Sequence, residues 1–221
     1  MIRGYLLYFL MLFTVQIFAQ YHFETTAHST SKRIFLELEV IDELRLFNSE
    51  NKNEFLVKEI GKEQGRKLNF EDKEGSMYLI ERILDLGEIE EEADKVCSIE
   101  PDYNTYELYV PVGVEVYLSI VYGNFKSNSF KGELNLMVEK GIIKIKDLQG
   151  DSKVKINAGK VFVNGVENIL IDAETNMGII VAHQDLGMIS ENKRKLNTQV
   201  GSGKDSMLIR AIMANIYFNA P

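Results

Sequence analysis

The sequence predicts a mostly β protein whose C-terminal half is a single-chain parallel β-solenoid with coils of about 18 residues. Three observations lead to this prediction. Apolar and polar residues alternate in short runs along much of the chain, glycines recur at a fixed spacing in its second half, and apolar residues keep the same distances from those glycines. The 221 residues are 45% hydrophobic and 26% charged. This composition is typical of a globular protein and excludes an intrinsically disordered one.

The first 19 residues are predicted to be a secretory signal peptide. Arg3 precedes an apolar run from Tyr5 to Val15, and Ala19 is the small residue that signal peptidase requires before the cut. An uncleaved N-terminal anchor is the alternative, although the run is shorter than the ~20 residues of a spanning helix. We therefore expect an exported protein, in the periplasm or at the cell surface, with no transmembrane segment in the mature chain.

Charge divides the rest of the chain into an acidic segment, 20–113, and a segment of nearly balanced charge, 114–221. The first segment has 11 Lys+Arg against 22 Asp+Glu, and the second has 13 against 11. The acidic segment is expected to be β-rich, because alternating apolar runs occupy 34–40, 43–47, 54–57, 77–80 and 106–110. The net charge of −8 disfavours nucleic acid or an anionic membrane as the main partner.

The second segment contains two series of glycines that are predicted to occupy corners of the chain, where glycine accepts φ > 0. Gly123, Gly141, Gly159 and Gly178 are spaced 18, 18 and 19 residues apart, and Gly132 and Gly150 fall halfway between them. Apolar columns accompany the first series: Leu118, Leu136, Val154 and Ala173, and Phe125, Ile143, Val161 and Ile180. Coils are therefore expected to stack in chain order, with Met207–Phe218 capping the open end. An antiparallel meander of hairpins is the alternative.

The stretch from Tyr106 to Gly113, followed by Leu118 to Phe125, resembles the opening of adhesin-like domains in bacterial envelope proteins. Those domains are similar in having a strand that ends in Val-Pro and then short strands with Gly-Asn or Gly-Asp corners. The signal peptide, which ends Phe-Ala-Gln, is similar to those of the Bacteroidetes. The resemblance implies a single-chain β-solenoid with an adhesin-like role and without catalytic residues. This chain departs from the pattern in its acidic front half and in the polar loop after Gly187.

Five lysines form the candidate ligand-contact patch: Lys144, Lys146, Lys153, Lys155 and Lys160. They are interpreted as a contact for an anionic glycan or for the acidic half of a neighbouring copy, or else as solvated lysines that protect sheet edges.

No catalytic, cofactor or metal site is predicted. His22, His28 and His183 lack metal-ligand spacing, and the lone Cys97 can form no internal disulfide. The motif Gly201–Ser206 (GSGKDS) lacks the first glycine of a phosphate-binding loop and is predicted to be a hairpin turn.

The sequence therefore predicts an exported, non-enzymatic, adhesin-like envelope protein that binds a glycan or protein partner through outward faces and loops. A periplasmic envelope scaffold or stress-linked accessory protein is the alternative. A solenoid enzyme that cleaves acidic polysaccharides ranks third, because it would need carboxylates clustered on one face, whereas those of this chain are scattered.

Overall fold

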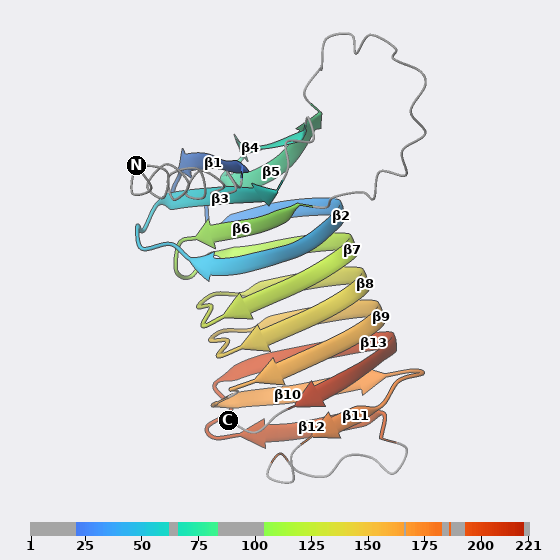
Figure 1. Cartoon of the computed structure of the whole chain (residues 1–221). Helices are drawn as coiled ribbons and strands as arrows, with labels where there is room; N and C mark the ends of the chain where they lie inside the picture. Colours follow the sequence, from blue (N-terminus) through green and yellow to red (C-terminus); the bar gives the residue numbers. More distant parts are fainter. Residues whose placement is uncertain are drawn as a thin grey trace, which may run out of the picture.

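A computed structural model of the chain describes residues 21–61, 66–83, 104–165, 167–182, 186 and 193–218. Every element in these ranges is a β-strand, and the strands form one mixed sheet that is not closed (Figure 1). The mostly β prediction is confirmed. The predicted signal peptide, Cys97 and His183 lie outside the described residues.

Thirteen strands make up the sheet. The acidic segment supplies β1 (Tyr21–His28), β2 (Arg33–Asn48), β3 (Glu54–Gly61), β4 (Arg66–Lys73), β5 (Ser76–Ile83) and β6 (Thr105–Val110). The rest of the chain supplies β7 (Glu115–Asn128), β8 (Leu134–Lys146), β9 (Ser152–Asn164), β10 (Ile169–Thr175), β11 (Ile180–Ala182), β12 (Lys195–Val200) and β13 (Asp205–Phe218). The runs expected at 34–40 and 43–47 form the single strand β2, and the strands β1 and β4 were not predicted.

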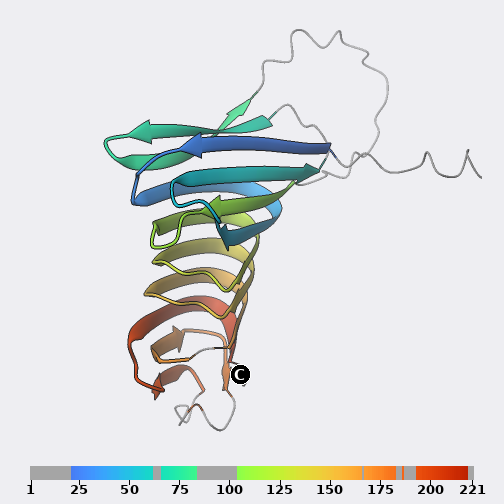
Figure 2. The ribbon, with the colours of Figure 1, turned by 90° about the vertical axis from the view of Figure 1, so that its left-hand side faces the viewer.

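The centre of the sheet is a stack of five long parallel strands, β2, β7, β8, β9 and β13, each bent near its middle (Figures 1 and 2). Leu118 pairs with Leu136 and Leu136 with Val154, so β7, β8 and β9 keep a constant register of 18 residues. Because these strands are parallel, the antiparallel meander is excluded for this part of the chain. We call the halves of each strand before and after the bend its first and second limbs.

The order of the strands departs from the order of the chain at the C-terminal end. β13 lies between β9 and β10, so that Val154 pairs with Ile209 and Ile209 with Ala173. The predictions that 169–182 stacks directly on β9, and that Met207–Phe218 caps the stack, are therefore wrong. β13 covers both limbs of β9 without a break, whereas 169–182 is interrupted between β10 and β11. The sheet path instead ends with β10 and its antiparallel partner β12.

At the other end, β2 joins the acidic segment to the stack. Leu36 pairs with Leu118 and Leu44 with Phe125, with a shift in register between Val40 and Glu43. β6, β3 and β1 continue the sheet from the second limb of β2, while β5 and β4 continue it from the first limb. Residues on both sides of the predicted boundary at residue 113 thus belong to this one sheet.

Inward side chains form apolar columns that cross the strands within a single core. The predicted columns gain members from β2 and β13 and become Leu36, Leu118, Leu136, Val154, Ile209 and Ala173, and Leu44, Phe125, Ile143, Val161, Ile216 and Ile180. Each of these side chains is at most 3% exposed. Full burial stabilises the fold by about 1.5–3 kcal/mol for each large aliphatic or aromatic side chain.

Glycines at the bend let neighbouring strands approach closely. A Cβ atom on Gly141 would lie 1.7 Å from the carbonyl oxygen of Gly123, and one on Gly159 would lie 1.9 Å from that of Gly141. Gly159 has φ 137°, whereas Gly141 is not among the residues with positive φ. Glycine is therefore required at position 141 because it has no Cβ atom, and not because of its backbone conformation. Gly178 lies against Ala214 of β13, because β13 separates it from β9.

The second glycine series lies outside the strands. Gly132 and Gly150 occupy the connections before β8 and β9, where the amide of Gly132 donates to the carbonyl of Gln149 at 3.0 Å.

Candidate functional site

The outward side chains of the stacked strands form two faces. We call groove face the one made by the first limbs, with outward side chains in 33–39, 115–121, 133–139, 151–157, 206–210 and 170–174. We call front face the one made by the second limbs, with outward side chains in 43–47, 124–128, 142–146, 160–164 and 215–217. The front face is turned toward the viewer in Figure 1.

The five lysines of the predicted contact patch are divided between these faces. Lys153 and Lys155 lie on the groove face, and Lys144, Lys146 and Lys160 lie on the front face. All five are exposed. Their closeness along the chain had grouped them in the sequence analysis, but the bend of β9 separates Lys155 from Lys160.

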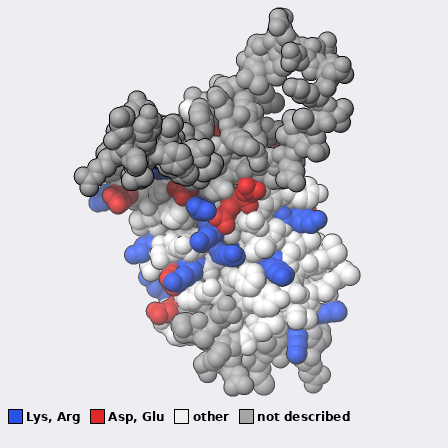
Figure 3. All heavy atoms as spheres, in the orientation of Figure 1, with Lys and Arg blue, Asp and Glu red and all other residues white. Residues whose placement is uncertain are grey.

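Lys126 joins the lysines of the front face, because it pairs in register with Lys144. We call Lys126, Lys144, Lys146 and Lys160 the front basic cluster; Figure 3 shows Lys and Arg side chains across this face. A hollow of about 260 Å³ lies among three of these lysines, lined also by Asn128, Ile145, Phe162 and Asn164. Lys126 was not predicted as part of this patch, although it lies one repeat before Lys144 and thus in the same column.

Two larger hollows, of about 480 and 350 Å³, adjoin on the groove face, where Tyr117, Asn135 and Lys153 line both. We call them together the groove. The larger hollow extends toward Leu170 of β10, which is 46% exposed, and the smaller toward Met137 of β8, which is 44% exposed. Exposed apolar side chains beside amide and charged groups are typical of sites that bind a partner or ligand.

Four carboxylates line the larger hollow: Glu115, Glu133, Asp151 and Asp172. Three of them, Glu115, Asp151 and Asp172, have partners within the protein. Arg33 Nε lies 3.3 Å from Glu115, which also accepts a hydrogen bond from the hydroxyl of Tyr117. Asp151 accepts hydrogen bonds from the amide and the hydroxyl of Ser206, at 2.8 and 2.7 Å.

The hydrogen bond between Tyr117 and Glu115 changes the pKa of the tyrosine hydroxyl. The pKa of Tyr117 is raised, chiefly because its hydroxyl donates to that carboxylate and secondly because of burial. Loss of the proton would place two anions side by side. Tyr117 is therefore kept as a hydrogen-bond donor in the wall of the groove.

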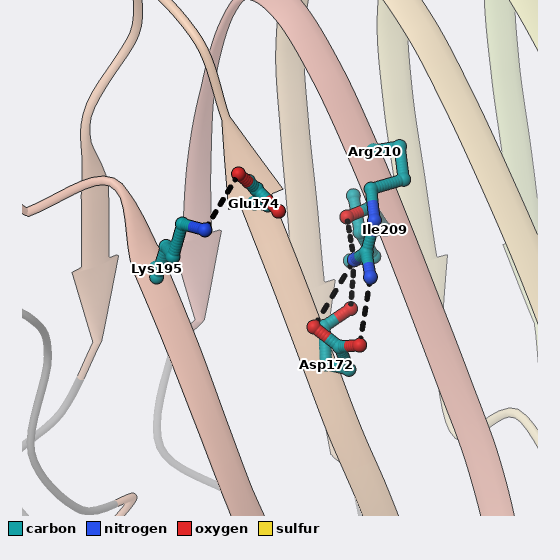
Figure 4. A network of polar contacts seen from close by, with 5 residues as sticks. All are labelled: Asp172, Glu174, Lys195, Ile209 and Arg210. Carbon is teal, nitrogen blue, oxygen red and sulfur yellow. Dashed lines mark hydrogen bonds and ion pairs between the residues drawn. The ribbon is translucent and has the colours of Figure 1, made fainter.

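Arg210 joins β13 to β10 through Asp172 (Figure 4). Its guanidinium donates to both carboxylate oxygens of Asp172, at 3.1 and 2.7 Å, and to the backbone carbonyl of the same residue at 3.0 Å. The hydrogen bonds to the Asp172 carboxylate raise the pKa of Arg210. Lys195 Nζ lies 3.0 Å from Glu174, which extends the ionic contacts to β12. This end of the groove is thus cross-linked over three strands.

Aromatic rings form a ladder along the groove face. Phe35 stacks on Tyr78 with ring centroids 5.1 Å apart and on Tyr117 with centroids 4.6 Å apart. The ladder follows the strand spacing, since the three residues pair across β5, β2 and β7. Stacked aromatic pairs of this kind contribute about 0.5–1.5 kcal/mol beyond burial. The stacked rings of Phe35 and Tyr117 form part of the wall of the smaller hollow.

The remaining candidates from the sequence lie elsewhere. His28 is exposed on β1, and among the described residues no three His, Cys, Asp or Glu side chains are grouped so that they could hold a metal ion. The GSGKDS turn connects β12 to β13, but these strands lie on either side of β10 and do not pair, so the hairpin prediction is wrong. Within the described ranges no helix is long and apolar enough to cross a membrane.

No protein-family model and no curated protein sequence matches the chain. Among solved structures it is similar to a candidate cell adhesion protein from Clostridium sporogenes, with a TM-score of 0.61 and 16% identity over 91% of this chain and 100% of that one. A candidate adhesin from Bacteroides fragilis gives a TM-score of 0.37 and 10% identity over 91% and 98% of the two chains. At 16% identity the first likeness shows that the two proteins share a fold.

Proposed function

We propose that this chain is an exported, non-catalytic, adhesin-like protein of the bacterial envelope that binds a glycan or protein partner through the groove. The observation that carries the proposal is the groove itself, in which Tyr117, Asn135 and Lys153 connect two hollows beside exposed apolar side chains. The fold shared with the candidate cell adhesion protein of Clostridium sporogenes supports the same class of function. We further propose that the stacked strands form a parallel β-solenoid. The constant 18-residue register of β7, β8 and β9 supports this architecture.

Binding fits the groove better than acid–base chemistry does. A general acid or base must be free to exchange its proton with a substrate. Three of the four carboxylates that line the larger hollow, Glu115, Asp151 and Asp172, instead hold Arg33, Ser206 and Arg210 in place and thereby support the groove wall. Within the described part of the chain, this leaves Glu133 as the one carboxylate of that hollow without such a role. Asn135 and Lys153 remain as polar groups that can contact a ligand, next to the apolar side chain of Met137.

Protease shaving of intact cells tests the location. Cells that express the full chain with an epitope tag are treated with protease before and after lysis. We expect loss of the tag from intact cells. Loss only after lysis would overturn a surface role and would favour the periplasmic scaffold.

Filling the groove tests the site. Beads coated with the purified protein are screened against a glycan array and a panel of matrix proteins, and Asn135→Trp is compared with Thr26→Trp. Asn135 lies where the two hollows meet, whereas Thr26 is exposed on β1, away from the groove and from the front face. We expect binding to the selected partner to be lost in the first variant and kept in the second. Equal binding by both variants, or no partner in the screen, would overturn the assignment of the groove.

A further inference from the structure

The front face of β7, β8 and β9 carries charge of one sign. The outward side chains of the three second limbs include four lysines and three asparagines but no carboxylate: Asn124, Lys126, Asn128, Ile142, Lys144, Lys146, Lys160, Phe162 and Asn164. Among the described residues Lys126, Lys144 and Lys160 form no ion pair, and Lys146 has only the Asp147 carboxylate at 3.9 Å. The cluster is therefore largely uncompensated.

Protection of a sheet edge does not explain these lysines. Edge strands use lysine to prevent pairing with another chain. β7, β8 and β9 instead lie inside the sheet, since β2 flanks β7 and β13 flanks β9. Both backbone edges of each strand are already occupied by neighbours.

The arrangement also has a cost in the free protein. Lys126 and Lys144 are register partners on adjacent strands, and like charges opposite one another destabilise a sheet. The net charge of −8 for the whole chain does not cancel this local field, because charges beyond the Debye length of about 8 Å are largely screened. An anion bound between the lysines would relieve their repulsion.

We propose that the front basic cluster binds an anionic polysaccharide, a chain that bears carboxylates or sulfates on its sugars. The lysines would pair with the anionic groups, and the amides of Asn128 and Asn164, which line the same hollow as Lys144 and Lys146, would hydrogen-bond to sugar hydroxyls. This site lies on a different face from the groove and goes beyond the proposed function. It would hold the protein on an acidic polymer while the groove stays accessible.

Binding to dextran sulfate and polygalacturonate, with neutral dextran as the reference, tests the proposal. The purified full chain is compared with the triple variant Lys126→Gln, Lys144→Gln, Lys160→Gln. The control triple variant, Lys32→Gln, Lys52→Gln, Lys204→Gln, changes net charge equally at exposed positions outside both the front face and the groove. We expect a loss of at least about tenfold in affinity for the front variant and less than about threefold for the control, with affinity falling as salt rises.

Three results would overturn the proposal: no binding of either polyanion by the wild-type protein, equal losses in the two triple variants, or displacement of polygalacturonate by equivalent charge concentrations of double-stranded DNA. The last result would mean that charge alone is recognised. The groove variant Asn135→Trp should bind dextran sulfate normally, so a failure of the groove assignment and a failure of this one are distinguishable.

Discussion

Replacing Gly141 with alanine tests whether close approach of the strands at the bend requires glycine. The added Cβ would lie 1.7 Å from the carbonyl oxygen of Gly123 and 3.5 Å from the side chain of Val138. Carbon and oxygen atoms in contact are normally at least about 3.3 Å apart. β8 would therefore have to move away from β7 by about 1.6 Å at this point, and the nearby backbone atoms cannot yield as a flexible side chain would.

Such a displacement breaks hydrogen bonds of the ladder. An N···O distance of about 2.9 Å would open to about 4.5 Å, well beyond the bonding range. Two or three backbone bonds lost beside the core, each costing about 1–3 kcal/mol when a buried partner is left unsatisfied, give a total of about 4 kcal/mol. Chemical unfolding in urea, with the change read from the midpoint and slope, measures this loss.

Gly113→Ala is the matched control. Gly113 has φ 82°, but a Cβ atom at this position would meet no atom from elsewhere in the protein within 4 Å. The control therefore reports only the cost of a left-handed backbone, about 1–2 kcal/mol. If Gly141→Ala destabilised the protein no more than Gly113→Ala does, the argument from close approach would be refuted.

Three further predictions concern stability. Val138→Asp places an unpaired carboxylate at a fully buried position and should lower the free energy of unfolding in urea by about 3 kcal/mol or more. Met137→Asp, at the neighbouring outward position, should lower it by less than about 0.5 kcal/mol. Similar losses in the two variants would contradict the assigned inward and outward faces. Arg210→Gln removes a partly exposed ion pair and should cost about 1 kcal/mol or less, and the difference from wild type should shrink at high salt. The pKa of Asp72 is lowered by hydrogen bonds from Ser29 and Ser31. The stabilisation that Asp72 contributes is therefore present above the unfolded-state pKa of about 3.9 and is lost as pH falls through the lower folded-state pKa. Asp72→Asn should flatten this part of an acid titration followed by circular dichroism, and an unchanged profile would refute the role of Asp72.

The five lysines show how much of the candidate sites could be predicted from the sequence. Alternation along β8 and β9 predicted that Lys144, Lys146, Lys153, Lys155 and Lys160 point outward, and all five are exposed. Alternation could not show that the bend divides them between two faces, because the direction of a limb depends on packing across the core. The groove was not predicted either, since its lining comes from β2, β7, β8, β9, β10, β12 and β13.

Local pattern determined the strands, and tertiary packing determined their order. Leu118, Leu136 and Val154 recur at equal distances from glycines, so their shared column followed from the sequence alone. The same pattern placed Ala173 next, yet Ile209 occupies that position and Ala173 follows it. Any strand with matching apolar spacing can extend a column, and the sequence does not rank the candidates. Only the assembled core selects β13, because it covers both limbs of β9 without interruption.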